Sequence, residues 1–322
     1  MAREKSIKEL EDLPGIGPTT AEKLRASGID NLDKVAVMTP NELNELAGVS
    51  VEAAKKAIQA AKESTTITYE TGNAVYDRRK EVGKISTGSS ELDDLIGGGI
   101  EAGAITETYG RFASGKSQIG FQLSVNAQLP RNKGGMEGTV LFVDTESTFR
   151  PERIEAIAKG AGLDPEKVLE GIMVVRALTT EQQVLTIERA DKLIAEKNIK
   201  LIVVDSLTAL FRSEFIGRGA LGERQQKLNQ HIHKLQMLAD KYHLAVYITN
   251  QVMDNPGILF GDPTTPIGGN ILAHAATTRL YLKKSKEEKR IVRLGFAQHA
   301  GRRSCNKDNP GRHKELKYTV YR

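Results

Sequence analysis

The fold is decided by the stretch Gly110-Arg111-Phe112-Ala113-Ser114-Gly115-Lys116-Ser117. It fits the pattern G-x-x-x-x-G-K-[ST], in which glycines let backbone N–H groups wrap phosphate groups. In that pattern Lys116 reaches the β- and γ-phosphates of a nucleotide, and the Ser117 hydroxyl holds magnesium. Residues 104–109 alternate as a strand before the loop, and residues 118–128 have helical spacing after it. This strand–loop–helix context indicates a nucleotide-binding loop.

The segments around this loop repeat the order strand, helix, strand. Apolar runs predict strands at residues 139–143, within 168–175, at 201–204, at 244–248 and, at the end of the chain, at 316–320. Helical periodicity predicts one amphipathic helix over residues 180–196 and another over residues 223–242. Buried strands that alternate with helices indicate an α/β domain with a mainly parallel sheet covered on both faces. We expect this nucleotide-binding core to span residues 85–322.

Acidic side chains follow two of the predicted strands. Asp205 ends the run Leu201-Ile202-Val203-Val204, and Glu146 lies in Val143-Asp144-Thr145-Glu146. Because the carboxyl ends of parallel strands meet at one edge of a sheet, both should approach the phosphates. We expect Asp205 at the magnesium ion and Glu146 where it can orient and polarise water. For Asp144 we favour a structural role as a helix cap.

The first 64 residues predict a separate all-α domain. Leu13-Pro14-Gly15-Ile16-Gly17-Pro18 precedes a helix, and residues 46–50 form a fainter copy before a second helix; each helix should carry a hydroxyl cap. This arrangement resembles a pair of helix-hairpin-helix units. Gly15 and Gly17 leave amides open to a phosphate oxygen of DNA, although a plain helical bundle explains the first copy equally well and the second copy better. Residues 65–84 are polar and weakly periodic, which indicates a linker.

The composition is that of a globular intracellular protein. Hydrophobic residues make up 39% and charged residues 27% of the 322, and the net charge of +5 permits nucleic-acid binding without requiring it. No apolar run approaches the ~20 residues of a membrane span, and the single cysteine, Cys305, cannot form an internal disulfide. We expect a cytoplasmic protein, without a membrane partner.

Several blocks together resemble the archaeal RadA family of DNA strand-exchange recombinases, which belongs to the RecA superfamily. The likeness runs from about residue 6 to Leu294. The blocks that carry it are Leu13-Pro14-Gly15-Ile16-Gly17, Ile85-Ser86-Thr87-Gly88-Ser89, residues 95–99, Phe149-Arg150-Pro151-Glu152-Arg153, Asp205-Ser206-Leu207-Thr208, Gly217-Arg218-Gly219-Ala220, residues 223–228 and Thr249-Asn250-Gln251-Val252.

The resemblance implies a RecA-like core that binds ATP and Mg²⁺ and hydrolyses ATP in a DNA-dependent way. Glu146 would be the general base, and Lys116 would act beside it on the phosphates. Arg153 would lie against the adenine. Gln251 would sense the γ-phosphate and relay its presence to the loop that follows it. The implied function is filament formation on single-stranded DNA and strand exchange with a homologous duplex, in recombination and repair near the nucleoid.

The resemblance also implies DNA-binding and self-assembly segments. A segment from about residue 211 to residue 222, with Arg212, Arg218 and the following Arg224, and a segment from about residue 252 to residue 270 would line the filament axis. Guanidinium groups suit this role because their forked donors can bind two phosphate oxygens at once. The linker motif Tyr69-Glu70-Thr71-Gly72 matches the family's aromatic-x-x-small polymerisation motif, which joins one protomer to the next in a filament or ring.

The chain departs from the family pattern in the phosphate loop and at two places further along the chain. The family usually has Glu where this chain has Arg111, and Gly where it has Ala113, so Ala113 must tolerate a backbone geometry that glycine reaches more cheaply. Asn270 replaces a usual histidine. Residues 295–303 replace a stretch that caps the neighbouring protomer's ATP and carries a carboxylate, which puts cation-stimulated ATPase activity in question.

Two other interpretations fit part of the sequence. One is a recombinase paralogue, a mediator that binds ATP and DNA without catalysing strand exchange. The altered cap and the absence of Lys and Arg from residues 252–270 favour it. The other is a hexameric motor such as a replicative helicase, which shares the ATPase core but lacks the family-specific blocks.

Overall fold

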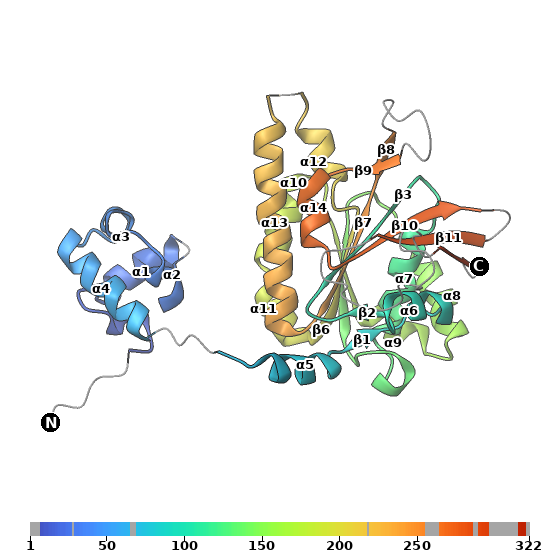
Figure 1. Ribbon diagram of the computed structural model, residues 1–322, viewed down its shortest axis with the longest axis horizontal. Helices are drawn as coiled ribbons and strands as arrows, with labels where there is room; N and C mark the ends of the chain where they lie inside the picture. Colours follow the sequence, from blue (N-terminus) through green and yellow to red (C-terminus); the bar gives the residue numbers. More distant parts are fainter. Residues whose placement is uncertain are drawn as a thin grey trace. The chain divides into compact units, whose positions relative to one another are not determined.

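The computed structural model describes residues 7–27, 29–64, 69–217, 219–254, 264–285, 289–295 and 315–319. The chain divides into two compact units, residues 1–78 and 79–322 (Figure 1). No helix of the described residues is long and apolar enough to cross a membrane.

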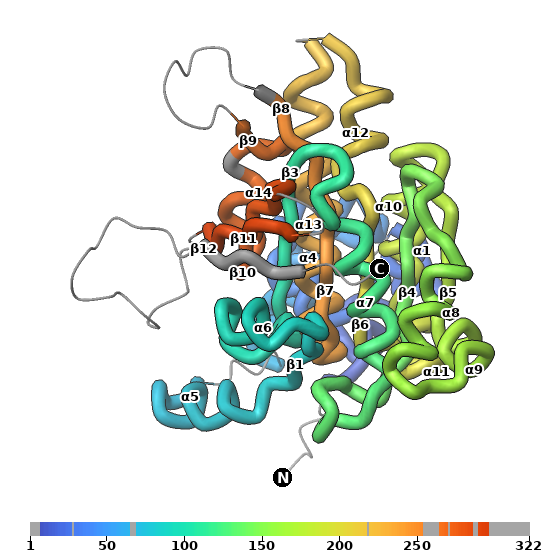
Figure 2. Tube along the Cα trace, turned by 90° about the vertical axis from the view of Figure 1, so that its right-hand side faces the viewer, coloured from blue at the N-terminus to red at the C-terminus, as the bar shows by residue number. Residues whose placement is uncertain are grey.

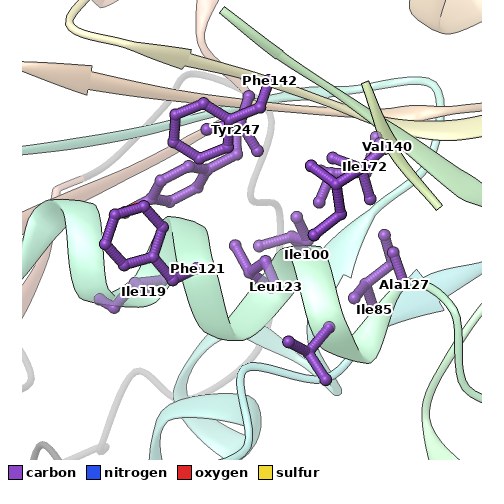
Figure 3. Close-up of a cluster of buried hydrophobic side chains, with 14 of the residues drawn as sticks. Ile85, Ile100, Ile119, Phe121, Leu123, Ala127, Val140, Phe142, Ile172 and Tyr247 are labelled. Atoms are coloured by element: carbon purple, nitrogen blue, oxygen red, sulfur yellow. The ribbon is translucent and has the colours of Figure 1, made fainter. Parts of the chain in front are cut away.

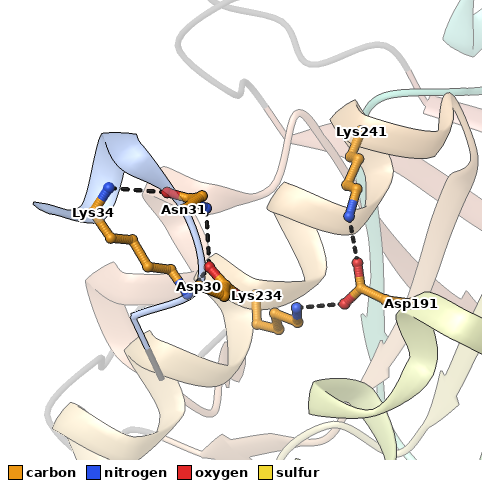
Figure 4. Close-up of polar contacts among 6 residues, drawn as sticks. All are labelled: Asp30, Asn31, Lys34, Asp191, Lys234 and Lys241. Carbon is orange, nitrogen blue, oxygen red and sulfur yellow. Dashed lines mark hydrogen bonds and ion pairs between the residues drawn. The ribbon is translucent and has the colours of Figure 1, made fainter. Parts of the chain in front are cut away.

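The N-terminal unit is helical, as predicted. Its elements are the 3₁₀-helix η1 (Leu10–Asp12) and the helices α1 (Pro18–Ala26), α2 (Leu32–Ala36), α3 (Pro40–Ala47) and α4 (Val51–Ser64). Leu24 and Leu43 are completely buried in its core. At the start of α2, Asn31 accepts a hydrogen bond from the Lys34 backbone N–H at 2.9 Å (Figure 4). Such caps satisfy N–H groups that a short helix would otherwise leave open.

Of the two predicted hydroxyl caps, the structure has the one at α4 and lacks the one at α1. Helix α1 begins after Gly17, with Pro18 in its first turn and no capping side chain, so the prediction is wrong there. Proline suits that position because its missing N–H would have had no helical partner. At α4 the Ser50 hydroxyl accepts from the Ala53 N–H at 3.2 Å, as predicted.

Residues 72–80 of the expected linker form a helix, α5 (Gly72–Lys80). Its polar sequence has no apolar stripe, and none of its residues is buried, which is why periodicity did not predict it. Arg78 forms an ion pair with Glu70 at 2.6 Å.

The larger unit is built on an eight-stranded sheet in the order β12-β11-β10-β3-β7-β6-β4-β5. Strands β10 to β5 of that order are parallel, and β11 and β12 add an antiparallel edge. The strands of the large sheet are β3 (Ile105–Gly110), β4 (Thr139–Asp144), β5 (Ile172–Arg176), β6 (Ile199–Asp205), β7 (Ala245–Asn250), β10 (Thr278–Lys284), β11 (Lys289–Gly295) and β12 (Glu315–Thr319). Two small antiparallel sheets pair β1 (Lys84–Ile85) with β2 (Ile100–Glu101), and β8 (Val252–Asp254) with β9 (Thr264–Pro266). The mainly parallel α/β fold is therefore confirmed.

Helices cover both faces of this sheet (Figures 1 and 2). On one face α6 (Ser90–Ile96), α7 (Lys116–Asn126), α8 (Pro151–Gly160) and α9 (Pro165–Glu170) pack around an aromatic cluster that includes Phe121, Phe142 and Tyr247 (Figure 3). On the other lie α10 (Thr180–Glu188), α11 (Ala190–Lys197), α12 (Ala209–Glu214), α13 (Leu221–Tyr242) and α14 (Gly269–Ala275). A short 3₁₀-helix, η2 (Arg131–Lys133), precedes β4. Along β6, Val203 faces the first core and Val204 the second, as the strand's two-residue period requires.

Two expectations about helices are corrected. The single helix over residues 180–196 is two helices, because Arg189 leaves helical geometry with a ψ of 2° between α10 and α11. Ile187 on α10 and Ile194 on α11 both lie in the second core. The segment at residues 211–222, where no helix was expected, begins as helix: α12 continues to Glu214, anchored by the buried Phe211.

A three-donor cluster joins α11 to α13. The Asp191 carboxylate accepts from Lys234 Nζ at 2.7 Å and from Lys241 Nζ at 2.8 Å (Figure 4). It also accepts from the Tyr242 hydroxyl at 3.0 Å. Burial alone would raise the pKa of Asp191, but these hydrogen bonds lower it to about 2.

Candidate functional site

The phosphate-binding loop leaves β3 and enters α7, as predicted. Gly110 allows no side chain, because a Cβ there would lie 2.2 Å from the Leu282 carbonyl oxygen. Gly115 has φ 103°, and Ala113 has φ 58°, so Ala113 occupies the left-handed region that glycine reaches more cheaply. The strain expected at Ala113 is confirmed; such a residue costs about 1 kcal/mol.

Lys116 lies at the first turn of α7, where its ammonium donates to the carbonyl oxygens of Gly110 at 2.9 Å and Arg111 at 3.1 Å. Burial lowers its pKa, while the nearby carboxylates of Asp205 and Glu146 oppose that shift. The Lys116 carbonyl accepts from the Tyr247 hydroxyl at 2.8 Å, which ties the start of α7 to the sheet. The loop carbonyl groups therefore hold the Lys116 ammonium group in place.

A cavity of about 530 Å³ opens over this loop, lined by Gly110, Arg111, Phe112, Lys116, Glu146, Gln251 and Val252. The Gln251 amide donates a hydrogen bond to Glu146 Oε1 across it. Burial raises the pKa of Glu146, and repulsion from Asp205 raises it further, although the bond from Gln251 opposes both. A carboxylate with a raised pKa is a better proton acceptor. The cavity thus brings together three side chains that come from separate parts of the sequence.

Asp205 and Asp144 lie side by side at the ends of β6 and β4. Asp205 is buried and accepts hydrogen bonds from the hydroxyls of Thr148, at 3.0 Å, and Thr249. Asp144 accepts backbone N–H bonds from residues 146, 148 and 149 at 3.0–3.2 Å. These bonds shape the loop that carries Glu146, so Asp144 does have a structural role. The prediction that it caps a helix is wrong, because α8 begins only after Arg150.

The residues expected to hold magnesium fit that ion. Among the described residues no group of three or more His, Cys, Asp or Glu forms a metal cage. Magnesium bound to a nucleotide takes few protein ligands and fills its shell with phosphate oxygens and water. Ser117, on α7 beside Lys116, and Asp205, held by two hydroxyls, suit such a site.

Arg153 lies on α8, and its Nε donates to Gln118 Oε1 on α7 at 2.7 Å. This bond holds the guanidinium group of Arg153 beside the first turn of α7, directly after the phosphate loop. An adenine-binding role for Arg153 stays a prediction.

The candidate DNA segments meet at a second cavity of about 340 Å³. Arg212 and Arg224 line it together with Met253, Ile267 and Gly268 from the β8–β9 region. Figures 1 and 2 show α12 and the β8–β9 hairpin at the same end of the unit. Two of the three expected arginines are therefore brought together with the second segment; Arg218 and residues 255–263 lie outside the described residues.

In the N-terminal unit, Gly15 has φ 82°, and a Cβ there would lie 3.2 Å from the Ala53 Cβ. Gly17 has open space around it and precedes α1. Tyr69, in the expected polymerisation motif, is 88% exposed, and Gly72 begins α5 in open space. Gly17 as a residue and the ring of Tyr69 are therefore both exposed.

Sequence reasoning missed a polar network on the strands that lead to the cavity over Lys116. Glu107, on β3, is completely buried and accepts from Arg279 Nε at 2.5 Å and from Asn250 Nδ2 at 2.8 Å. A glutamate within a strand whose neighbours are buried is the signal that could have revealed it, because buried charges are normally paired. No comparable sequence signal marks Thr148 and Thr249, whose hydroxyls donate to Asp205.

Comparison with known proteins agrees with this geometry. A family model described as Rad51 matches residues 78–305, and one described as a SAM-like helix-hairpin-helix tandem matches residues 7–63. The chain is similar to the DNA repair and recombination protein RadA of Aeropyrum pernix, with 48% identity over 295 residues that cover 92% of each chain. The chain therefore belongs to the Rad51 family of recombinases, in agreement with the RadA-like motifs of its sequence.

Proposed function

We propose that this chain is an ATP-dependent recombinase that assembles on single-stranded DNA and exchanges strands with a homologous duplex. The observation that carries the proposal is the position of Gln251. Its side chain contacts Glu146 in the nucleotide cavity, and its backbone leads directly into the β8–β9 hairpin at the candidate DNA segment. One residue therefore touches both the nucleotide site and the base of a DNA segment.

The nucleotide cavity supports ATP hydrolysis. Loop amides and Lys116 would bind the phosphates, and Ser117 and Asp205 would hold Mg²⁺, whose charge would offset that of the phosphates. Glu146, with its raised pKa, would take a proton from the attacking water while Gln251 holds the carboxylate in place. Arg153 would lie against the adenine.

The DNA contacts proposed for the chain are made to phosphates. Arg212 and Arg224 at the second cavity, with Arg218 in the segment between them, supply guanidinium donors. The amides at Gly15 and Gly17 of the N-terminal unit would bind a duplex backbone. Phosphate contacts position DNA without reading its sequence, so binding should be sequence-independent and should weaken steeply with salt.

Assembly would use the exposed motif at Tyr69 and Gly72. The Tyr69 ring, left 88% exposed, is available for insertion into another protomer. Strand β5 stands at one end of the sheet order among the described residues, so it offers an edge for strand addition. As a recombinase acting on chromosomal DNA, the protein would reside in the cytoplasm with the nucleoid.

Strand exchange between a circular single strand and a linear duplex tests the proposal. We expect joint molecules that require ATP and Mg²⁺, together with ATPase activity stimulated by single-stranded DNA. ATP and DNA binding without joint molecules would indicate a mediator. Directional unwinding by closed six-membered rings would indicate a motor. Electron microscopy with an ATP analogue and single-stranded DNA distinguishes rings from filaments.

A further inference from the structure

The last three residues before the β8–β9 hairpin connect separate parts of the site. The Thr249 hydroxyl binds Asp205, and its carbonyl accepts from the Leu207 N–H at 3.0 Å. Gln251 reaches Glu146 with its side chain and accepts from the Ile267 N–H at 3.0 Å with its carbonyl. Between them lies Asn250, which is completely buried and plays no part in the proposed hydrolysis.

Asn250 uses both ends of its side-chain amide. Its oxygen accepts from the Thr208 hydroxyl at 2.6 Å. Its nitrogen donates to the Ile267 carbonyl at 2.6 Å and to Glu107 Oε1 at 2.8 Å. A buried amide that uses both of its N–H donors and its oxygen fixes the elements that it joins, because any rearrangement leaves a partner unsatisfied.

The partners of Asn250 belong to the elements that the proposed function connects. Thr208 immediately precedes α12, which carries Arg212. Ile267 immediately follows β9, the returning strand of the hairpin. Ile267 is held at both ends, because its N–H binds Gln251 and its carbonyl binds Asn250. The bases of both candidate DNA segments are therefore joined through one side chain.

The charge beside Asn250 makes this an amide position. Glu107 is neutralised by Arg279, which lies 5.2 Å from the ring centroid of Tyr109. Both the Glu107 carboxylate and the Ile267 carbonyl need a donor, so a carboxylate at position 250 would face two acceptors in a buried setting. Losing the two amide donors is costly in a buried setting, even though aspartate and asparagine have nearly the same shape.

We propose that Asn250 is a positioning residue that makes the two candidate DNA segments respond together when nucleotide engages Gln251. The proposal rests on the proposed function for the role of those segments as DNA-binding elements. Glu107 and Thr208 are its partners: Glu107 fixes the amide against the strand that leads into the phosphate loop, and Thr208 transmits its position to α12.

The test compares Asn250→Asp and Thr208→Val with a matched buried asparagine, Asn126→Asp. Asn126, at the far end of α7, donates to the Ser86 carbonyl at 2.8 Å and accepts from Gln122 at 3.0 Å, away from both DNA segments. Amide hydrogen exchange of residues 207–214 and 264–269, with and without a magnesium–ATP analogue, reports the response of each segment. The ratio of ATPase rates with and without single-stranded DNA reports their coupling.

In the wild type we expect the nucleotide to protect both segments. Asn250→Asp should keep the KM for ATP within about twofold yet lose the joint protection and lower the rate ratio at least about fivefold. Thr208→Val should lose the response of residues 207–214 alone. Adding Glu107→Gln to Asn250→Asp should restore the ratio in part, because the amide at position 107 can then donate to the carboxylate at position 250 while the Ile267 carbonyl still lacks its donor. Asn126→Asp should leave both readouts unchanged.

The proposal is overturned if Asn250→Asp responds like the wild type, if Asn126→Asp lowers the ratio equally, or if the wild-type segments show no shared response to nucleotide. Failure of the proposed function gives a different result. In that case wild-type ATPase would ignore single-stranded DNA, while the exchange of the two segments would still respond jointly and depend on Asn250.

Discussion

Acid should destabilise the larger unit through His231, and the magnitude follows from its surroundings. The ring is 98% shielded from solvent on α13, with its centroid 5.9 Å from that of Phe211. Its Nε2 lies 3.3 Å from the Gln183 amide nitrogen, which can only donate, so this ring nitrogen accepts. Its Nδ1 has no partner among the described residues. A proton on the ring would therefore bury a charge and remove the acceptor for Gln183.

Burial lowers the pKa of His231 from 6.5 to about 4. Because the folded pKa lies below the unfolded one, the unfolded chain binds the extra proton as the pH falls below 6.5, and stability is lost. The full difference between the two pKa values corresponds to about 3 kcal/mol of folding stability, of which about 2 kcal/mol is lost between pH 7 and pH 5.

Native-state hydrogen exchange of the β6 amides measures the opening free energy of this unit alone. Between pH 7 and pH 5, we expect the opening free energy of His231→Gln to fall by about 2 kcal/mol less than that of the wild type. The exposed His233 of the same helix provides the control, and His233→Gln should follow the wild type. Parallel pH dependence in the wild type and His231→Gln would refute the reasoning, whatever the constant offset between them.

Three further predictions concern the cavity and the Asp191 cluster. Gln251→Leu removes the bond that opposes the raised pKa of Glu146, so the acid limb of the ATPase pH–rate profile should move to higher pH; an unchanged limb would exclude Glu146 as the titrating base. Ala113→Gly should leave the KM for ATP within about threefold, whereas Ala113→Val, a β-branched residue at φ 58°, should raise it at least about tenfold in steady-state kinetics; equal effects would show that the loop is not strained there. Asp191→Asn should lower stability at neutral pH by about 1 kcal/mol in exchange experiments, after allowance for the 34% exposure of the carboxylate. Because the pKa of Asp191 is about 2 in the folded protein against 3.8 ordinarily, that difference should fade as the pH drops through this window, and a difference that persists at pH 2 would contradict it.

The sequence predicted the elements whose pattern is local. The phosphate loop was recognisable because glycine and lysine spacing alone defines it, and the strand ending in Asp205 was recognisable because it is apolar throughout. The strain at Ala113 followed from the geometry that the loop requires. Helix α5 and the break at Arg189 could not be predicted, since no apolar stripe marks the first and the second depends on how two helices fill one core.

The contacts among distant residues were beyond sequence reasoning. Glu107, Asn250 and Arg279 lie on three strands whose order in the sheet differs from their order in the chain, so no spacing brings them together. Gln251 was assigned to the γ-phosphate by resemblance alone. Its contact with Glu146 places it in the cavity over Lys116, and its role at the γ-phosphate stays a prediction.

The central claim is that a nucleotide in the cavity over Lys116 controls whether protomers hold a DNA strand. The most direct test measures cooperative binding to fluorescent single-stranded DNA at fixed salt, with and without ATP, for the wild type and Lys116→Ala. We expect ATP to tighten binding by the wild type at least about tenfold, and to leave Lys116→Ala unaffected because the phosphate contact is lost. Equal, ATP-independent binding by both proteins would contradict the account.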